Sequence, residues 1–147
     1  MSKHYLEPTQ EAGAELFRRN IAGEVVMLNM LRLREFADYT SNPELAPEKQ
    51  ISGRDALQKY IELTLPFLKK SGGDLLLLGE GGKFLIGPGD EVWDVVMLVK
   101  QNSVESFFKF ASNAEYLSGL GHRTAAILDS RLLPIVELGT NYVHKGY

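Results

Sequence analysis

The sequence predicts a single α+β domain in which the elements follow the order β-α-β-β-α-β around a four-stranded antiparallel sheet. Three observations support this prediction. Residues 24–34 and 91–101 alternate like strands and are apolar on both faces over most of their length. Two helical stripes each begin after a capping serine. A proline inside the last predicted strand, residues 130–138, places that strand at a sheet edge, because proline cannot donate to a sheet ladder.

Length and composition agree with one ordinary globular domain. The chain has 147 residues, of which 44% are hydrophobic and 24% are charged. The net charge is −3 and the basic residues form no cluster, so we expect no nucleic-acid partner. The absence of cysteine excludes disulfides and thiol chemistry. Without an apolar run that resembles a signal peptide or a bilayer span, we expect a cytoplasmic protein with no membrane contact.

The chain is divided into a main domain and two short end segments. Residues 1–23 form an N-terminal helical extension, in which Thr9 is the N-cap of a helix over residues 10–20. The main α+β domain covers residues 24–138. Residues 139–147 form a C-terminal tail.

The first half of the domain begins with the strand at residues 24–34 and continues in a long loop, residues 35–51. A loop of this length is often a lid or a dimer arm. Ser52-Gly-Arg-Asp55 is a capping box that begins a helix, and this helix ends at Gly72-Gly73. A second strand covers residues 74–80. Residues 83–86 either extend it or pair with it across a glycine-rich turn.

The second half repeats the strand–helix order. The strand at residues 91–101 is followed by Ser103, which caps a helix. A second helical segment covers residues 114–128. The strand at residues 130–138, which contains Pro134, completes the sheet.

The apolar faces of the first and third strands predict a homodimer. A four-stranded sheet with helices on one side normally has polar residues on its other face, and these two strands do not. Leaving such a face in water would expose a larger apolar patch than monomers tolerate, so we expect two copies to pack sheet against sheet. The alternative is that the N-terminal helix and the long loop cover this face within one chain.

A set of short motifs, taken in order, resembles a known family. The motifs are Val25–Arg32 (VVMLNMLR), Gly53–Tyr60 (GRDALQKY), Gly72-Gly73, Trp93-Asp94, Ser103, Ala114-Glu-Tyr116, His122-Arg123-Thr-Ala-Ala and Asp129–Leu132. Together, over residues 24–138, they resemble the uncharacterised family called domain of unknown function 1330, within the dimeric α+β barrel superfamily. The resemblance implies a ferredoxin-like fold and a face-to-face dimer. It implies no particular reaction.

Three residues are the candidates for catalysis: His122, Arg123 and Asp94. Histidine titrates near neutral pH and can act as a general acid or base, and Arg123 beside it can orient a carboxylate or an enolate. The structural alternatives are a histidine on a helix surface and an arginine that binds loop carbonyls. Asp94 can likewise form a structural pair with Arg32 or Arg123.

Five more residues are candidates for ligand binding: Asn29, Arg32, Tyr60, Trp93 and Tyr116. Asn29 and Arg32 point to opposite faces of the first strand, so one of them lies in an apolar interior and needs a partner or a ligand. Trp93 and Asp94 pose the same choice on the third strand. Tyr60 lies on the core stripe of its helix. No residue spacing indicates a metal site, and we expect no cofactor.

These candidates lead to three hypotheses of function. The first is a small-molecule enzyme or binder with a pocket between sheet and helices, in which cofactor-independent proton transfer or oxygenation of a small carbonyl or aromatic compound fits the groups present. The second is a protein that binds haem or another apolar ligand, with His122 as the axial ligand. The third is a non-catalytic interaction module whose function is its dimer surface.

Overall fold

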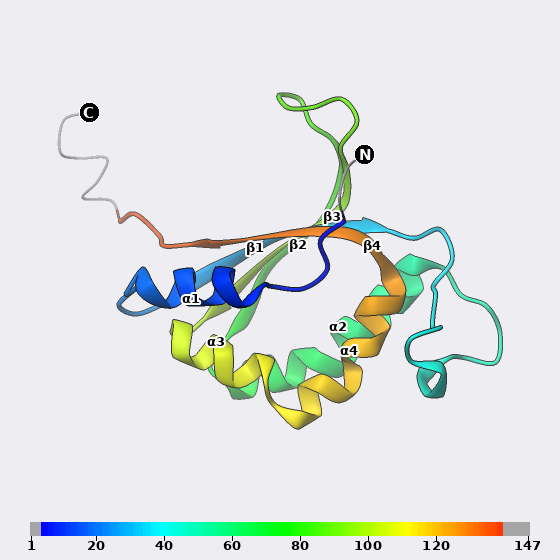
Figure 1. The fold of residues 1–147 in the computed structure, drawn as a ribbon, viewed down its shortest axis with the longest axis horizontal. Helices are drawn as coiled ribbons and strands as arrows, with labels where there is room; N and C mark the ends of the chain where they lie inside the picture. The colour runs from blue at the N-terminus through cyan, green and yellow to red at the C-terminus, as the bar shows by residue number, and fades with distance from the viewer. Residues whose placement is uncertain (1–3, 140–147) are drawn as a thin grey trace.

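Four antiparallel strands form the sheet in the computed structural model, which describes residues 4–139. The strands are β1 (Val25–Leu33), β2 (Asp74–Lys83), β3 (Val92–Gln101) and β4 (Ile127–Ile135). They lie in the order β2-β3-β1-β4, with β4 at one edge as Pro134 predicts (Figure 1). This order, with a helical layer on one face, is the ferredoxin-like arrangement, so the predicted fold class is confirmed.

The helices cover one face of the sheet (Figure 1). They are α1 (Gln10–Arg18), α2 (Gly53–Lys70), α3 (Val104–Ala111) and α4 (Ala114–Ala126), with a short 3-10 helix, η1 (Pro43–Leu45), in the long loop. Thr9, Ser52 and Ser103 each accept a backbone N–H at the start of a helix, as predicted.

Two boundaries differ from the prediction for a physical reason. The last helix ends at Ala126 and β4 begins at Ile127, whose backbone is already extended, so no loop separates the two elements. The second strand continues to Lys83, because its glycines pair with β3 as far as Lys83 opposite Val92. Beyond the sheet, β2 and β3 therefore form a hairpin that rises on the side opposite the helices (Figure 1). The predicted C-terminal tail, 139–147, lies outside the described residues except for Gly139.

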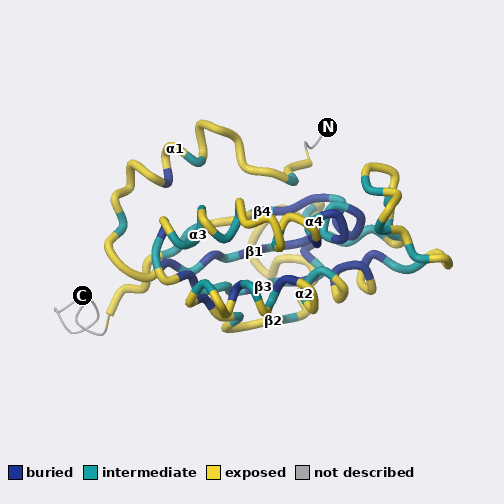
Figure 2. Tube along the Cα trace, turned by 90° about the horizontal axis from the view of Figure 1, so that it is seen from below, coloured by how far each residue is buried: buried dark blue, intermediate teal, exposed yellow. Residues whose placement is uncertain are grey.

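The core lies between the sheet and the helices. In Figure 2 the buried positions follow alternate residues of β1 and β3 and the facing sides of α2 and α4. The main buried cluster joins residues of these elements with the start of β4: Leu31, Ala56, Leu57, Val95, Met97, Ala126 and Ile127. Asn29 shares this inner face, whereas Arg32 lies on the other face, so the choice between them is resolved by the register of β1.

The opposite side of the sheet, called the open face below, has an apolar centre. It consists of the residues that alternate with the core positions and pair with one another across the strands: Val26, Leu28, Met30, Leu77, Val96, Leu98, Leu133 and Ile135. Helix α1 does not cover it, because Leu16 packs against Val25, Met27 and Val104 on the helical side. Ala37, Tyr39 and Ile51 of the long loop pack against the core cluster on the same helical side, so within residues 4–139 neither α1 nor these loop residues cover the open face.

No helix of the described chain is both long and apolar enough to cross a membrane.

Candidate functional site

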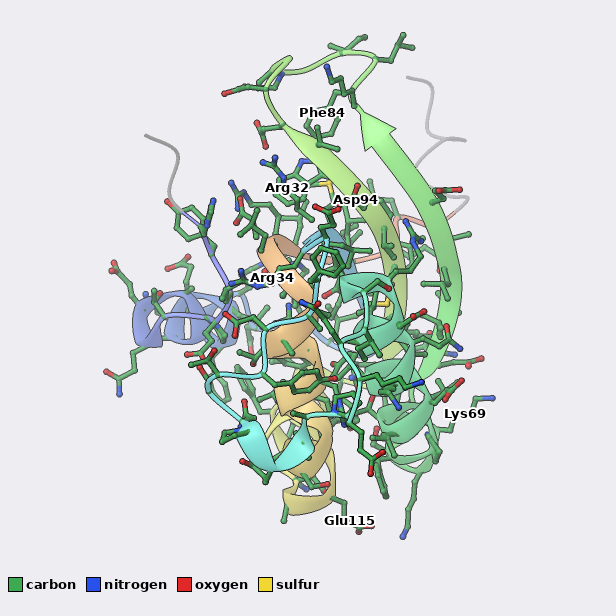
Figure 3. All side chains as sticks on the ribbon, turned by 90° about the vertical axis from the view of Figure 1, so that its right-hand side faces the viewer. Arg32, Arg34, Lys69, Phe84, Asp94 and Glu115 are labelled. Carbon is green, nitrogen blue, oxygen red and sulfur yellow. The ribbon has the colours of Figure 1, made fainter. Side chains whose placement is uncertain are left out.

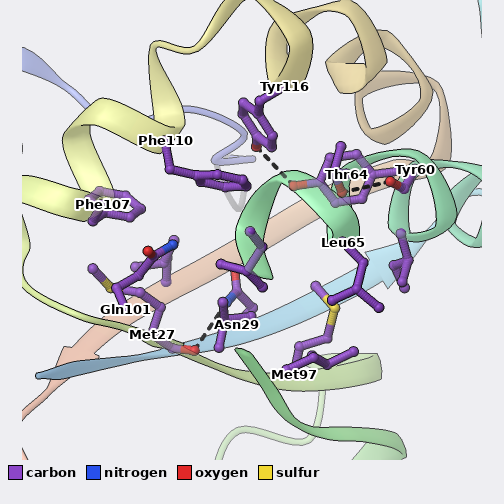
Figure 4. A pocket seen from close by; sticks show the side chains of 15 residues that line it. Met27, Asn29, Tyr60, Thr64, Leu65, Met97, Gln101, Phe107, Phe110 and Tyr116 are labelled. Atoms are coloured by element: carbon purple, nitrogen blue, oxygen red, sulfur yellow. Dashed lines mark hydrogen bonds between the residues drawn. The ribbon is translucent and has the colours of Figure 1, made fainter. Parts of the chain in front are cut away.

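A pocket of about 90 Å³ lies between the inner face of the sheet, α2, α3 and the first turn of α4 (Figure 4). Most of its wall is apolar, supplied by aliphatic and aromatic residues such as Met27, Leu65, Met97, Phe107 and Phe110. Its polar groups come from four elements: Asn29 of β1, Gln101 of β3, Tyr60 and Thr64 of α2, and Tyr116 of α4. A concave apolar site with a few converging polar groups is the usual form of a small-molecule site.

Two tyrosines form the polar group on the helical side of this pocket. The hydroxyls of Tyr60 and Tyr116 are 2.8 Å apart, and their rings meet edge to face. Only one of the two hydroxyl protons can lie between the oxygens, so the pair always retains a second O–H that can donate elsewhere. Burial raises the pKa of Tyr60, and the neighbouring Tyr116 raises it further, so Tyr60 stays protonated at neutral pH.

Two amides form the polar groups on the sheet side. Asn29 donates from Nδ2 to the carbonyl of Met27 at 3.2 Å, and its Oδ1 accepts no hydrogen bond from residues 4–139. Gln101 is only 1% exposed, and its buried Oε1 has no hydrogen-bond partner in the described part of the chain. A buried acceptor without a partner costs about 1–3 kcal/mol. Both amides can therefore take a hydrogen bond from a molecule in the pocket.

The side chains around the pocket carry no formal charge. Among the described residues that line it there is no aspartate, glutamate, lysine, arginine or histidine. Nothing there offsets the cost of moving an ion out of water. The geometry therefore suits an uncharged molecule that is mostly apolar and carries a group able to accept a hydrogen bond from the tyrosine pair.

His122 lies away from this pocket and is engaged in packing. It is buried, and its Nδ1 is 2.7 Å from the hydroxyl of Tyr39 in the long loop. Burial, with a smaller effect of Lys59, lowers the pKa of His122. The prediction that a structural His122 would be a helix-surface residue is wrong, because the loop covers it.

Arg123 and Asp94 also bind backbone groups. Arg123 donates from Nη1 to the carbonyl of Leu6 at 3.0 Å, the loop-binding role considered for it above. Asp94 accepts from the backbone N–H of Leu33 at 2.7 Å. The structural pair of Asp94 with Arg32 or Arg123 does not occur among the ion pairs of the described residues. Asp94 instead ties β3 to the end of β1.

Arg32 and Trp93 lie at a second, smaller hollow of about 30 Å³ on the other side of the sheet, near the base of the hairpin. Figure 3 shows Arg32 and Asp94 close to this base. Here Arg131 lies between the rings of Tyr5 and Trp93, with its guanidinium carbon 4.8 Å and 4.9 Å from their centres. A hollow of this size holds about one water molecule, so it is too small for a ligand.

Asp129 anchors this cluster. Its Oδ1 accepts from the guanidinium of Arg131 at 2.7 Å and from the backbone N–H of Tyr5 at 2.8 Å. Burial alone would raise the pKa of Asp129, but these hydrogen bonds outweigh it and the pKa is lowered. The cluster fastens the start of the chain to β4.

The structure thus brings three of the eight predicted site residues together at the pocket: Asn29, Tyr60 and Tyr116. The sequence analysis did not identify Gln101, Phe107 or Phe110 as site residues. Gln101 could have been found from its position on the third strand, because every second residue of a strand faces the same side and Gln101 alternates with Met97 and Val99. In residues 4–139, no group of three or more histidine, cysteine or acidic residues could hold a metal ion.

The solved structures that resemble this chain include a relative and a more distant fold match. No family model and no functionally curated protein matches the chain, so the resemblance to domain of unknown function 1330 stays a prediction. An uncharacterised NIPSNAP domain protein from Burkholderia xenovorans is 10% identical, with a TM-score of 0.50 over 79% of this chain and 96% of its own. That likeness concerns the fold alone.

The relative is the RPA0582 protein of Rhodopseudomonas palustris, a protein of unknown function whose structure has been solved in two forms, one of them methylated. Both are 33% identical to this chain, have TM-scores of 0.80, and match 93% of it. The matches cover 97% of the methylated chain and 99% of the other. With this identity over nearly the whole of both chains, the protein belongs to the family of RPA0582.

Proposed function

We propose that the protein binds a small, uncharged, mostly apolar molecule with a carbonyl group in the pocket between the sheet and α2, α3 and α4. The observation that carries this proposal is the Tyr60–Tyr116 pair beside an otherwise apolar cavity. Because Tyr60 stays protonated, the pair offers a hydroxyl proton to a carbonyl oxygen. Asn29 and Gln101, on the sheet side, give a second polar group of the ligand a place to bind.

Size and charge narrow the class of ligand. A cavity of about 150 Å³ holds benzene, and this pocket, at about 90 Å³, is smaller and partly open. A short-chain or small cyclic ketone is therefore a suitable probe, and a carboxylate of the same length is its charged counterpart. The haem hypothesis has less support, because His122 does not line the pocket and its Nδ1 already binds Tyr39.

The binding proposal is tested by NMR titration of the full chain with 2-pentanone and with butyrate. We expect 2-pentanone to shift signals of pocket residues and butyrate not to. Tyr60→Phe combined with Tyr116→Phe removes both hydroxyls of the pair, so that neither tyrosine can donate to the carbonyl, and should weaken ketone binding about fivefold, which corresponds to about 1 kcal/mol.

The matched control is Tyr39→Phe, which removes a hydroxyl from another aromatic hydrogen bond without changing the pocket. If both compounds bind equally, or if the two phenylalanine variants weaken binding equally, the tyrosine pair is not the recognition group. Saturation of the ketone signal shifts without any change at Tyr60, Asn29 or Gln101 would contradict the site.

We further propose that two copies of the chain pair through their open faces, as in a dimeric α+β barrel. The eight apolar residues of the open face are flanked toward its ends by charged residues, which pairing or strand alternation places on the same face: Asp74, Lys100, Arg32, Asp94, Arg131 and Asp129. An apolar centre with a polar rim is the usual composition of a stable interface. Light scattering should give a dimer for the native chain and a monomer for Leu133→Asp, which puts a charge on the exposed part of this face.

A further inference from the structure

The hairpin between β2 and β3 ends in an apolar run without intrachain cover. Leu85 is 100% exposed and Ile86 is 92% exposed, whereas Phe84 before them is 38% exposed and its ring lies against Gly87 in the same loop. In Figure 3, Phe84 lies toward the far end of the hairpin, well beyond Arg32 and Asp94 at its base. Single exposed apolar residues are ordinary, but a consecutive run at the end of a projecting hairpin requires a function.

The base of this hairpin is built as a regular ladder. Pairing of β2 with β3 continues through Gly82 opposite Trp93 and Lys83 opposite Val92. A Cβ at Gly81 would collide with the backbone carbonyl of Trp93, so the two strands approach each other closely there. The apolar run is therefore presented by a paired two-stranded arm that begins in the sheet itself.

The arm and the open face lie on the same side of the sheet. Figure 1 shows the hairpin projecting from the sheet on the side opposite the helices, so it projects from the same side as the open face and lies next to it. In a two-fold dimer both copies use the same surface. A copy resting on the open face must therefore lie next to the arm, and its own arm must lie next to the first copy.

We propose that Phe84, Leu85 and Ile86 form a clasp that packs against a second copy of this chain. The inference rests on the open-face dimer proposed above and adds the arm to its interface. The strand that contributes Leu77 to the open face runs on into the arm, and the clasp follows it in the hairpin loop. The charged rim at Arg32 and Asp94 separates the apolar centre of the open face from the clasp, so the clasp forms a second, separate contact with the other copy. Each copy contributes one clasp, and the dimer therefore has two.

The charge of the arm argues against a lipid surface as the partner of the clasp. The arm carries three acidic residues, Glu80, Asp90 and Glu91, and one basic residue, Lys83. The whole chain has a net charge of −3. Peptides that bind anionic membranes carry clusters of lysine and arginine beside their apolar residues. The arm lacks such a cluster.

The test compares the association of three chains by sedimentation equilibrium. The clasp variant is Leu85→Asp with Ile86→Asp, and the matched control is Leu63→Asp with Leu117→Asp, two half-exposed leucines of the helical layer. We expect the native chain and the control to have the same dimer dissociation constant. The clasp variant should dissociate roughly tenfold or more readily, since four aliphatic side chains, two from each copy, are no longer buried. Circular dichroism checks that all three chains are folded.

A second readout uses the absence of cysteine. In Leu85→Cys the new thiol is the only one in the chain, and an environment-sensitive fluorophore attached to it reports burial of the clasp. Its emission should shift to the blue as protein concentration rises through the dissociation constant. A shift produced only by anionic vesicles would overturn the proposal in favour of a membrane.

The outcomes separate the clasp from the dimer. If Leu133→Asp gives monomers and the clasp variant associates like the native chain, the open-face dimer stands and the clasp is wrong. If the native chain is monomeric at micromolar concentration, both are wrong. Neither outcome changes the ketone-binding test, which depends on the other side of the sheet.

Discussion

The two ends of α4 each carry an aromatic hydrogen bond, yet their surroundings differ. At its first turn, Tyr116 meets Tyr60 beside the pocket. At its last turns, His122 meets Tyr39, and the carbonyl of Ala126 accepts the N–H of Arg34, in a region packed by the long loop. The more reactive side chain lies at the packed end. His122 is already engaged by packing, whereas the Tyr60–Tyr116 pair borders a pocket, and this difference is the reason why we propose the pocket rather than His122 as the binding site.

The largest loss of stability should come from replacing Gly53, a glycine that contacts the packed end of α4. A Cβ at Gly53 would overlap the carbonyl of Arg34 and lie 2.8 Å from that of Ala126, two backbone groups that cannot move aside. Gly53→Ala should therefore lower the free energy of unfolding by about 3 kcal/mol or more.

Gly119 is the matched control nearer the pocket end. A Cβ there would lie 3.3 Å from the methyl group of Thr64, a side-chain atom. Gly119→Ala should change the free energy of unfolding by less than about 1 kcal/mol, because alanine also favours the helix. Urea unfolding followed by circular dichroism measures both. Equal losses would show that the two ends are packed alike.

A smaller loss is expected from His122→Ala. The change removes a buried ring and leaves the hydroxyl of Tyr39 without its partner, which should cost about 2–3 kcal/mol. Tyr39→Phe, which removes the hydroxyl alone, should cost about 1 kcal/mol. Urea unfolding measures both, and NMR titration of the folded variants measures ketone binding. A folded His122→Ala chain that no longer binds the ketone would place His122 in the site.

The smallest expected effect is a change of stability with pH. Burial lowers the pKa of His122 in the folded chain, so the unfolded chain binds more protons between that value and its own pKa near 6.5. The stability contributed by the neutral ring is present above about pH 6.5 and is lost as the pH falls through the folded pKa.

The urea midpoint should thus fall on acidification from neutral pH in the native chain and fall less in His122→Gln. Asp129 does not interfere, because its lowered pKa contributes stability that is present above the unfolded pKa near 3.8 and is lost only as the pH falls below that value. An identical pH dependence of the two chains would show that His122 is not the titrating group.

Local rules were sufficient to predict most of the fold. The capping serines Ser52 and Ser103 and the proline at position 134 each depend on chemistry within a few residues, and all three have the predicted role. The start of β4 could not be predicted in this way. A helix that passes directly into a strand has no turn residues to mark the boundary, and Ile127 suits either element.

The candidate site was predictable only where a residue's face was known. Tyr60 lies on the apolar stripe of its helix, which directs it inward. Gln101 alternates with Met97 and Val99, but it ends its strand, where polar residues are common, and its pairing opposite Val25 is what shows that it faces inward. His122 and Arg123 were candidates because of the chemistry of their side chains. The sequence does not show that Tyr39 and Leu6, far away along the chain, form hydrogen bonds with them.

Helix α1 has a consequence for how the protein avoids aggregation. The outer strand β4 would normally offer free backbone groups to a strand of another molecule. Pro134 has no N–H to offer, and its carbonyl is already bound by Arg19, just after α1, at 3.1 Å. The appended helix thus helps to close one edge of the sheet. A chain shortened by residues 1–23 would lose this protection and become prone to add strands at β4.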